Sequence, residues 1–234
     1  MPNHSLTTRV LIIGASRGLG LGLAAEYLAR GCHVVGTVRA DRQTGLHELE
    51  ARAGSLLSIE QLDINVPEQT QALGNRLQGH QFDLLFVNAG VANDRDETIA
   101  DVSTDMFVQV MVTNALSPMR VIEELQGVLS SSGTIAVMSS RLGSVSGNNT
   151  GGDEVYRASK AALNTLMRSY AARHADGRRA LLLITPGWVQ TDMGGADADL
   201  DVATSVRGVV ETVGMQAGKP GLRFLDYRGQ TVDW

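Results

Sequence analysis

The stretch Arg-Val-Leu-Ile-Ile-Gly-Ala-Ser-Arg-Gly-Leu-Gly, residues 9–20, decides the fold class of this chain. Its first five residues read as a short apolar strand, and Gly14, Gly18 and Gly20 follow at the start of a helical pattern. Glycines at this spacing let the backbone turn tightly, and the helix presents unpaired N–H groups to a phosphate. The stretch therefore indicates a nucleotide-binding strand–turn–helix, although glycines alone could also mark a simple turn.

Short apolar runs alternate with helical patterns on either side of this stretch. Runs dense in Val, Ile and Leu are typical of strands covered on both faces. The alternation predicts one α/β domain spanning residues 1–234, a Rossmann-type doubly wound parallel sheet with helices on both faces. The expected strands are Arg9–Ile13, His33–Val38, Ser55–Gln61, Asp83–Val87, Thr134–Met138, Ala180–Thr185 and Leu222–Leu225. The expected helices are Leu19–Arg30, Gln43–Ala53, Pro67–Gln78, Thr104–Leu129, Glu154–Ala175 and Leu200–Met215.

Composition excludes several classes of function. The net charge is −5 and the basic residues are scattered, so the chain offers no electrostatic footprint for nucleic acid or an anionic membrane. Cys32 is the single cysteine and the five histidines show no metal-ligand spacing, so we expect no internal disulfide and no metal. The apolar runs are too short to span a membrane, and the N-terminus lacks a signal-peptide layout. We expect a cytoplasmic protein.

Tyr156 and Lys160 are the strongest candidates for reacting groups. Residues four apart on a helix lie on one face, one turn apart. A neighbouring positive charge favours the phenolate, so Lys160 is expected to lower the pKa of Tyr156 from its ordinary value of about 10. Tyr156 could then exchange a proton near neutral pH. The alternative is a surface pair that stabilises the helix slightly.

The order of these and other motifs resembles the short-chain dehydrogenase/reductase family over nearly the full length. The resemblance implies a single doubly wound domain, a nicotinamide cofactor, and hydride exchange between a carbonyl and an alcohol. The chain departs from the family pattern at Ile13, where Thr is frequent, and at Val87, where Asn is frequent. The motifs are the glycine turn, Asn88-Ala89-Gly90, Asn114, Ser139-Ser140, Tyr156 with Lys160, and Pro186-Gly187.

The resemblance implies a role for each catalytic candidate. Tyr156 would be the general acid in reduction, and Lys160 would hold the nicotinamide ribose. Ser140 would polarise the substrate oxygen; it is preferred to Ser139 because two residues and then a glycine follow it, and successive strand-end side chains point oppositely. Asn114 would hold a water through its backbone and relay protons from Lys160 to solvent, unless it is a tolerated surface residue.

The end of the second expected strand bears on the choice of nicotinamide. It has no carboxylate before Arg39, and Arg39 together with Arg17 could clamp the ribose phosphate, which favours NADP(H) over NAD(H). Either arginine could instead be merely solvated, and Asp41 could weaken the preference. The expected cofactor contacts are Gly14, Ser16, Arg17, Gly18, Leu19, Gly20, Arg39, Asp63, Ile64, Asn88, Ala89, Gly90, Tyr156, Lys160, Pro186, Gly187, Val189 and Thr191. Two of these have capping alternatives, because Asp63 could cap a helix and Thr191 could cap a short one.

Four longer stretches resemble the sniffer and C-factor-like carbonyl reductase branch of the family. This narrower resemblance implies NADPH-dependent reduction of an aldehyde, ketone or quinone. Two alternatives stay open: a secondary-alcohol dehydrogenase working in the oxidative direction, and a non-catalytic dinucleotide-binding regulator. The stretches are Ser139–Asn148, Tyr156–Asn164, Pro186–Gly194 and Arg223–Trp234.

The expected substrate loops are 141–152 and 188–200, with 91–96 as a further wall of the pocket. The second loop is rich in glycine and could fold over the cofactor as a lid. Family members usually self-associate, so the resemblance implies a homodimer or homotetramer formed through the expected helices 104–129 and 154–175.

Overall fold

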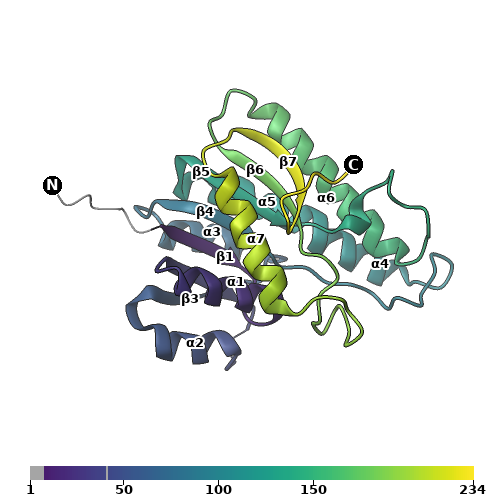
Figure 1. Ribbon diagram of the computed structural model, residues 1–234, viewed down its shortest axis with the longest axis horizontal. Coiled ribbons are helices and arrows are strands. Elements are labelled where there is room, and N and C mark those ends of the chain that lie inside the picture. The colour runs from purple at the N-terminus through teal and green to yellow at the C-terminus, as the bar shows by residue number, and fades with distance from the viewer. Residues whose placement is uncertain (1–7, 41) are drawn as a thin grey trace.

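The computed structural model describes residues 8–40 and 42–234 and contains a seven-stranded parallel sheet (Figure 1). The strand order is β3-β2-β1-β4-β5-β6-β7. The strands are β1 (Arg9–Ile13), β2 (His33–Val38), β3 (Leu57–Gln61), β4 (Phe82–Val87), β5 (Leu129–Met138), β6 (Ala180–Thr185) and β7 (Gly221–Asp226). The α-helices are α1 (Gly18–Ala29), α2 (Gly45–Ala53), α3 (Pro67–Arg76), α4 (Thr104–Met111), α5 (Ser117–Leu125), α6 (Glu154–Arg173) and α7 (Val202–Gln216).

The central strand β1 pairs in parallel with β2 on one side and with β4 on the other. The chain therefore builds one half of the sheet outward to β3 and then crosses back to start the second half at β4. Ligands of such sheets bind at the carboxyl ends of the strands, where the strand order reverses. That point lies between the segments that follow β1 and β4.

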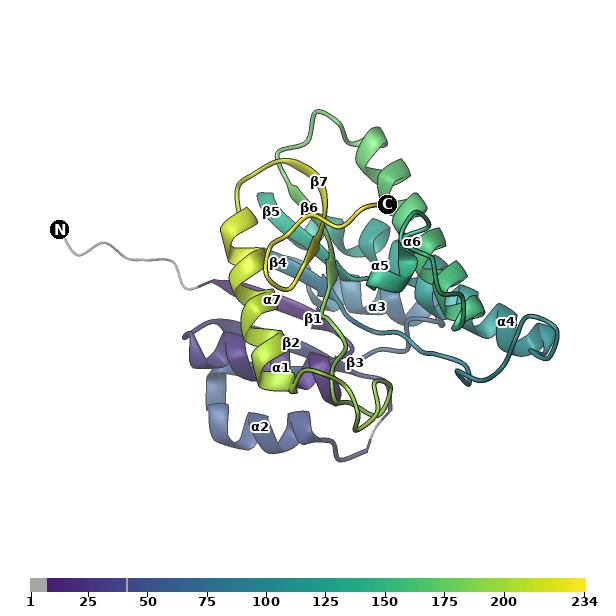
Figure 2. The same cartoon turned by 45° about the vertical axis from the view of Figure 1, so that its right-hand side comes forward.

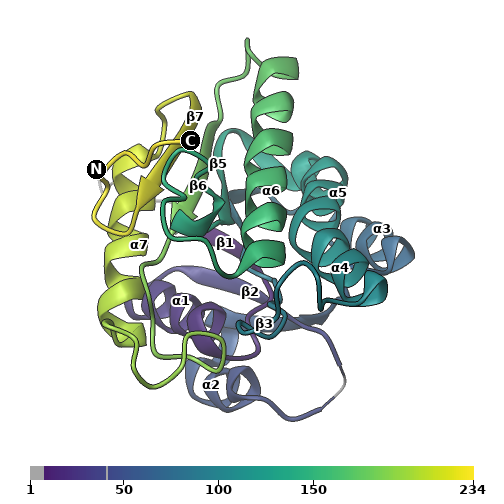
Figure 3. The same ribbon diagram turned by 90° about the vertical axis from the view of Figure 1, so that its right-hand side faces the viewer.

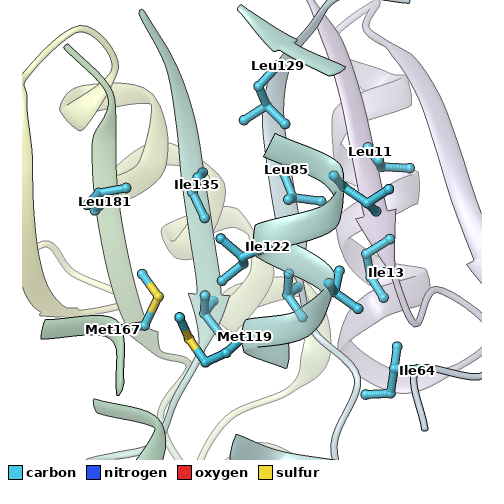
Figure 4. Packing of buried hydrophobic residues seen from close by; sticks show 14 of the residues in the cluster. Leu11, Ile13, Ile64, Leu85, Met119, Ile122, Leu129, Ile135, Met167 and Leu181 are labelled. Atoms are coloured by element: carbon cyan, nitrogen blue, oxygen red, sulfur yellow. The ribbon is translucent and has the colours of Figure 1, made fainter. Parts of the chain in front are cut away.

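Helices cover both faces of the sheet, with α1, α2 and α7 on one side and α3, α5 and α6 on the other (Figure 2). Alternate residues of β1 point into the two layers: Val10 and Ile12 pack with α1 and α7, whereas Leu11 and Ile13 pack with the opposite helices. Figure 4 shows the cluster that contains Leu11 and Ile13, in which Ile122 of α5 packs over the sheet. The doubly wound prediction is confirmed.

One predicted helix, 104–129, is wrong in its interior and at its end. The structure divides it into α4, a π-helical turn Val112–Leu116, α5 and a short 3-10 turn Gln126–Val128, after which β5 begins at Leu129. Strand β5 is thus longer than the expected Thr134–Met138, because Leu129 pairs with Phe82 ahead of an irregularity in the register. The other predicted elements begin and end within two residues of their observed bounds.

Helices in the described ranges are too short or too polar to cross a bilayer, α6 included.

Candidate active site

The glycine turn after β1 is held in a strained, compact shape by its neighbours. Gly14 has φ +86°, a left-handed conformation that side chains disfavour. Its carbonyl oxygen accepts a hydrogen bond from Asn88 Nδ2 at 2.9 Å, and a Cβ added at Gly20 would lie 2.0 Å from the same oxygen. The Thr37 hydroxyl accepts from the Gly14 N–H at 2.9 Å. Gly14, Gly18 and Gly20 therefore keep side chains away from three positions at the N-terminus of α1, which fits the phosphates of a dinucleotide.

Sequence reasoning missed Thr37, although a buried hydroxyl in the otherwise apolar β2 was a usable signal. The frequent family Thr before the first glycine is replaced by Ile13, and Thr37 supplies a hydroxyl to the turn from the next strand. The departure at Ile13 thus leaves the turn supported.

The four other predicted residues of the turn lie at the start of α1. Ser16 and Leu19 are half-buried, and Gly18, the first residue of α1, also faces the segment after β6: a Cβ at Gly18 would lie 3.7 Å from the Thr191 side chain. Arg17 is exposed, and its Nη1 forms an ion pair with Asp192 Oδ2 at 2.6 Å. Arg17 therefore links the turn to the segment after β6, a contact that the sequence did not suggest.

Arg39 lies directly after β2 and is exposed. Within the described residues it has no acidic partner, in contrast to Arg17. Asp41, which could weaken the NADP(H) preference, lies outside the described residues.

Asp63 and Ile64 follow β3 as expected, and Ile64 is buried in the core. The Asp63 carboxylate accepts from the Asn65 N–H at 2.9 Å, and its own N–H donates to Gln69 Oε1. These bonds form a turn ahead of α3, so the carboxylate is not the N-cap of that helix. The N-cap position belongs to Val66.

Helix α6 places Tyr156 and Lys160 one turn apart at the carboxyl edge of the sheet. Lys160 Nζ lies 5.7 Å from the Tyr156 ring centroid and donates to the Met138 carbonyl at 2.9 Å, at the end of β5. The lysine is buried. Ser140, two residues beyond Met138, lies close enough to the Tyr156 phenol for its hydroxyl to lower the pKa of that phenol. The predicted Ser140, Tyr156 and Lys160 are therefore brought together.

The two adjacent serines point in different directions, as strand alternation predicts. Ser139 is buried and its hydroxyl donates to Asn164 Oδ1 at 2.7 Å, which ties β5 to α6. Ser140 is half-buried and its Oγ accepts from the Leu142 N–H at 3.1 Å. Only Ser140 faces the phenol.

The expected direction of the pKa shift at Tyr156 is wrong. Burial raises the pKa of Tyr156 to about 12; the Ser140 hydrogen bond lowers it in part, and the Asp153 charge raises it further. Burial also lowers the pKa of Lys160 to about 8. The ammonium points at the Met138 carbonyl rather than at the phenolic oxygen, so desolvation outweighs any attraction between the pair.

Asn114 lies in the π-helical turn and is fully buried. Its Oδ1 accepts from the Val91 N–H at 2.8 Å, and its Nδ2 donates to the Val91 carbonyl at 2.7 Å and to Ser159 Oγ at 3.0 Å. The alternative of a tolerated surface residue is therefore wrong. Its side chain fastens the segment after β4 to α6, beside Gly90, where an added Cβ would lie 3.2 Å from Asn114 Oδ1.

The segment after β6, residues 188–200 (the predicted lid), forms a compact loop beyond Pro186 and Gly187. Val189 is buried and pairs with Leu200, which closes the lid on itself. The Thr191 hydroxyl donates to the Val189 carbonyl at 3.3 Å and accepts from the Gly194 N–H at 3.0 Å. The capping alternative for Thr191 thus describes its present bonds, within a turn rather than a helix.

Two other loops meet the lid or its surroundings at the edge that faces the viewer in Figure 3. Arg95, after β4, donates to the Met193 carbonyl at 3.1 Å and lies over the Trp188 ring at 6.0 Å. The loop 141–152 is fixed from the other side, because the Ser146 hydroxyl donates to the Trp234 carbonyl at 2.6 Å. The loop after β4 is therefore joined to the segment 188–200, and the loop after β5 to the C-terminal residue.

Two hollows elsewhere lack the catalytic candidates. One of about 240 Å³ lies between the end of α6 and the starts of β5, β6 and β7, and another of about 450 Å³ lies between α6, β7 and Trp234. The chemistry of the Ser140, Tyr156 and Lys160 cluster identifies the site better than the size of either hollow does.

Comparison with known proteins agrees with this geometry. The family model described as short chain dehydrogenase matches residues 8–200. A short-chain dehydrogenase/reductase from Burkholderia multivorans with bound NADP is 55% identical, with a TM-score of 0.96 over 97% of this chain and 100% of that one. The carbonyl reductase Sniffer of D. melanogaster is 30% identical, with a TM-score of 0.87 over 97% and 100%. C-signal from Myxococcus xanthus is 39% identical over 65% of this chain and 92% of its own length.

Three findings agree. The family model matches most of the chain, the sheet is parallel and doubly wound, and the site brings Ser140, Tyr156 and Lys160 together. The chain belongs to the short-chain dehydrogenase family of oxidoreductases, and its structural relatives include carbonyl reductases.

Proposed function

We propose that the protein reduces a carbonyl group of an aldehyde, ketone or quinone to an alcohol, with NADPH as the hydride donor. The observation that carries the proposal is the cluster at the carboxyl edge of the sheet, where Ser140 lies beside the Tyr156 phenol at the end of β5 and Lys160 lies one turn away on α6. The NADP bound to the Burkholderia relative and the carbonyl reductase Sniffer support the same assignment.

The dinucleotide would be held by the chain's own cradle. The free N–H groups at the start of α1 meet its phosphates, and Gly14 and Gly20 leave room for them. Lys160, whose pKa of about 8 keeps it largely protonated at neutral pH, donates to a ribose hydroxyl. When bound, the reduced nicotinamide supplies the hydride.

Tyr156 and Ser140 act on the carbonyl oxygen. The Ser140 hydroxyl donates a hydrogen bond to it and so favours the negative charge that develops there. Tyr156 gives up its proton to the same oxygen, which completes the alcohol. A pKa of about 12 keeps the phenol protonated at neutral pH, so it has a proton to donate.

The preference for NADP(H) rests on Arg39 in this proposal. Its guanidinium lies at the end of β2 without an acidic partner among the described residues, whereas Arg17 is paired with Asp192. A planar guanidinium can bind a phosphate with two parallel hydrogen bonds. The free Arg39 therefore supports recognition of the ribose phosphate, with Arg17 as a second group once it leaves Asp192.

Self-association is also proposed, through the helical layer formed by α4, α5 and α6. Val108, Leu116 and Leu166 are exposed on this layer. Light scattering on the purified protein would give a mass of two or four chains, and a mass of one chain would contradict it. The proposed location is the cytoplasm, where both NADPH and small carbonyl compounds occur.

The test of the function is a carbonyl panel followed by the loss of NADPH absorbance, with Tyr156→Phe and Ser140→Ala as variants. Removing the proton donor is expected to lower kcat by about 10²–10⁴-fold while NADPH binding is retained. Tyr227→Phe is the matched control, because Tyr227 lies after β7 and is outside the cluster. Full activity of Tyr156→Phe would refute the assignment, and cofactor binding without turnover by the parent would indicate a regulator.

A further inference from the structure

Three segments form the rim of the candidate site: 91–101 after β4, 141–154 after β5, and 188–201 after β6. They meet through contacts between their own residues. Arg95 in the first segment donates to the Met193 carbonyl in the third, and the Ile99 N–H donates to Glu154 Oε2 in the second at 2.5 Å. Tyr156 follows the second segment directly. The rim therefore borders the site at Tyr156.

The rim is strongly acidic. Its three segments contain ten Asp or Glu residues and two arginines, whereas the rest of the chain contains fifteen acidic and eighteen basic residues. The whole chain has a net charge of −5, so the rim is more negative than the protein to which it belongs. Negative charge is therefore concentrated on the loops around the site.

Ion pairs compensate little of this charge, although the Arg157 guanidinium of α6 donates to the Gly152 carbonyl of the second segment at 2.8 Å. Among residues 8–40 and 42–234, the one rim carboxylate in an ion pair is Asp192, with Arg17. The Arg95 guanidinium donates to the Met193 carbonyl and lies over the Trp188 ring. Charges of the rim act on the reacting group, because the Asp153 charge raises the pKa of Tyr156 and the Arg95 charge lowers it.

The rim also exposes large apolar side chains. The described residues include eight large exposed hydrophobic side chains, and half of them lie on the rim. The four are Ile99, Val145, Trp188 and Met193, with exposed fractions of 60%, 74%, 44% and 43%. Exposed apolar side chains rimmed by polar residues are typical of ligand-binding sites. The rim thus combines apolar contact surface with negative charge.

From this combination, and resting on the proposed reductase function, we infer that the substrate is an apolar carbonyl compound without negative charge, and that the acidic rim rejects anionic ones. Like charges repel a ligand before it enters, and an apolar ligand gains by covering the exposed side chains. The anionic cofactor does not contradict this, because its phosphates would meet the N-terminus of α1, Arg39 and Arg17, and Arg17 already offsets the rim charge of Asp192 there.

The experiment compares an aliphatic methyl ketone with the keto acid of the same chain length, which carries its carboxylate at the far end. The kcat/KM for the keto acid is expected to be about tenfold lower than that for the ketone at low ionic strength. The ratio of the two values should approach unity near ~0.5 M salt, because salt screens the charge of the rim. Equal values for the two compounds at low salt would overturn the inference.

Variants separate the rim charge from general effects. The triple variant Asp96→Asn, Asp197→Asn, Asp199→Asn removes three exposed rim charges. It should raise the keto-acid to ketone ratio of kcat/KM about threefold or more, whereas Glu50→Gln, Glu124→Gln, Asp176→Asn, outside the rim, should leave that ratio unchanged. A ratio that responds equally to both sets would overturn the inference.

Failure of the reductase function would look different. If the protein reduces neither compound, the proposed function fails and the inference is decided by calorimetric binding of the matching secondary alcohol and hydroxy acid. Tighter binding of the alcohol, with a difference that salt removes, supports the acidic rim. Equal binding, or tighter binding of the hydroxy acid, refutes it.

Discussion

Replacing Asn114 by Ala tests whether this residue acts through its side chain. The side chain is fully buried and makes three hydrogen bonds that join the segment after β4 to α6. A typical net contribution of ~0.5–1.5 kcal/mol per bond predicts a loss of about 3 kcal/mol in the free energy of unfolding. Water can reach the half-buried Val91 groups and recover part of this loss.

For a chain of 234 residues, that loss lowers Tm by about 6–12 °C. Thermal unfolding followed by circular dichroism measures it, with Asn75→Ala on the exposed face of α3 as the control, expected within about 0.5 kcal/mol of the parent. Action through the backbone alone would leave the Asn114→Ala variant as stable as the parent. A Tm within about 2 °C of the parent value would therefore refute the bracing role.

Three further predictions follow from the turn, the lysine and the arginines. Gly20→Ala is expected to weaken NADPH binding at least about tenfold in a titration, because its Cβ would lie 2.0 Å from a carbonyl oxygen of the turn, whereas Gly214→Ala in α7 meets no atom within 4 Å and should stabilise the protein by up to about 1 kcal/mol. Burial lowers the pKa of Lys160 from 10.5 to about 8, so the unfolded chain binds more protons than the folded one between these pH values. The free energy of unfolding should therefore rise with pH in that range. Urea unfolding between about pH 8 and 10 should show this rise in the parent and not in the Lys160→Met variant. Arg39→Gln is expected to lower the NADPH to NADH affinity ratio about tenfold, and Arg17→Gln less, because Arg17 is already paired with Asp192.

Each of these has an outcome that contradicts it. Unchanged NADPH affinity in Gly20→Ala would mean that the turn can shift to admit a methyl group. Parallel pH profiles of the parent and the Lys160→Met variant would mean that the lysine titrates as it does in water. An equal fall in the affinity ratio for both arginine variants would mean that the ion pair to Asp192 does not hold Arg17 back.

The fold was predictable because its signals are local. Strands buried on both faces need continuous Val, Ile and Leu, and the glycine turn marks where β1 passes into α1. The order of motifs at the strand ends then predicts the cluster, since the carboxyl ends of parallel strands share one edge. Alternation of side chains predicts that only one of the two serines faces the cleft, the family pattern selected Ser140, and the buried Ser139–Asn164 bond agrees with that choice.

The rest could not be predicted because it depends on long-range contacts. The π-helical turn at Asn114 is compatible with ordinary helical residues and forms around bonds to Val91, which the sequence does not announce. The pKa of Tyr156 depends on how deeply the phenol is buried, and the Arg17–Asp192 pair joins residues 175 positions apart. The polar start of β5 reads as a loop until Leu129 is seen beside Phe82.

The placement of β1 at the centre of the sheet has a consequence for how the chain acquires its structure. One edge of β1 is satisfied early by β2, but the other waits for β4, with Leu11 beside Leu85. Pairings so distant along the chain slow folding, because the entropy of closing the intervening loop is lost before any contact is gained. Until β4 is synthesised, the apolar edge of β1 is open to other chains, and partly made protein is at its most prone to aggregate. The yield of folded protein during expression thus depends on strand order as well as on the stability of the finished fold.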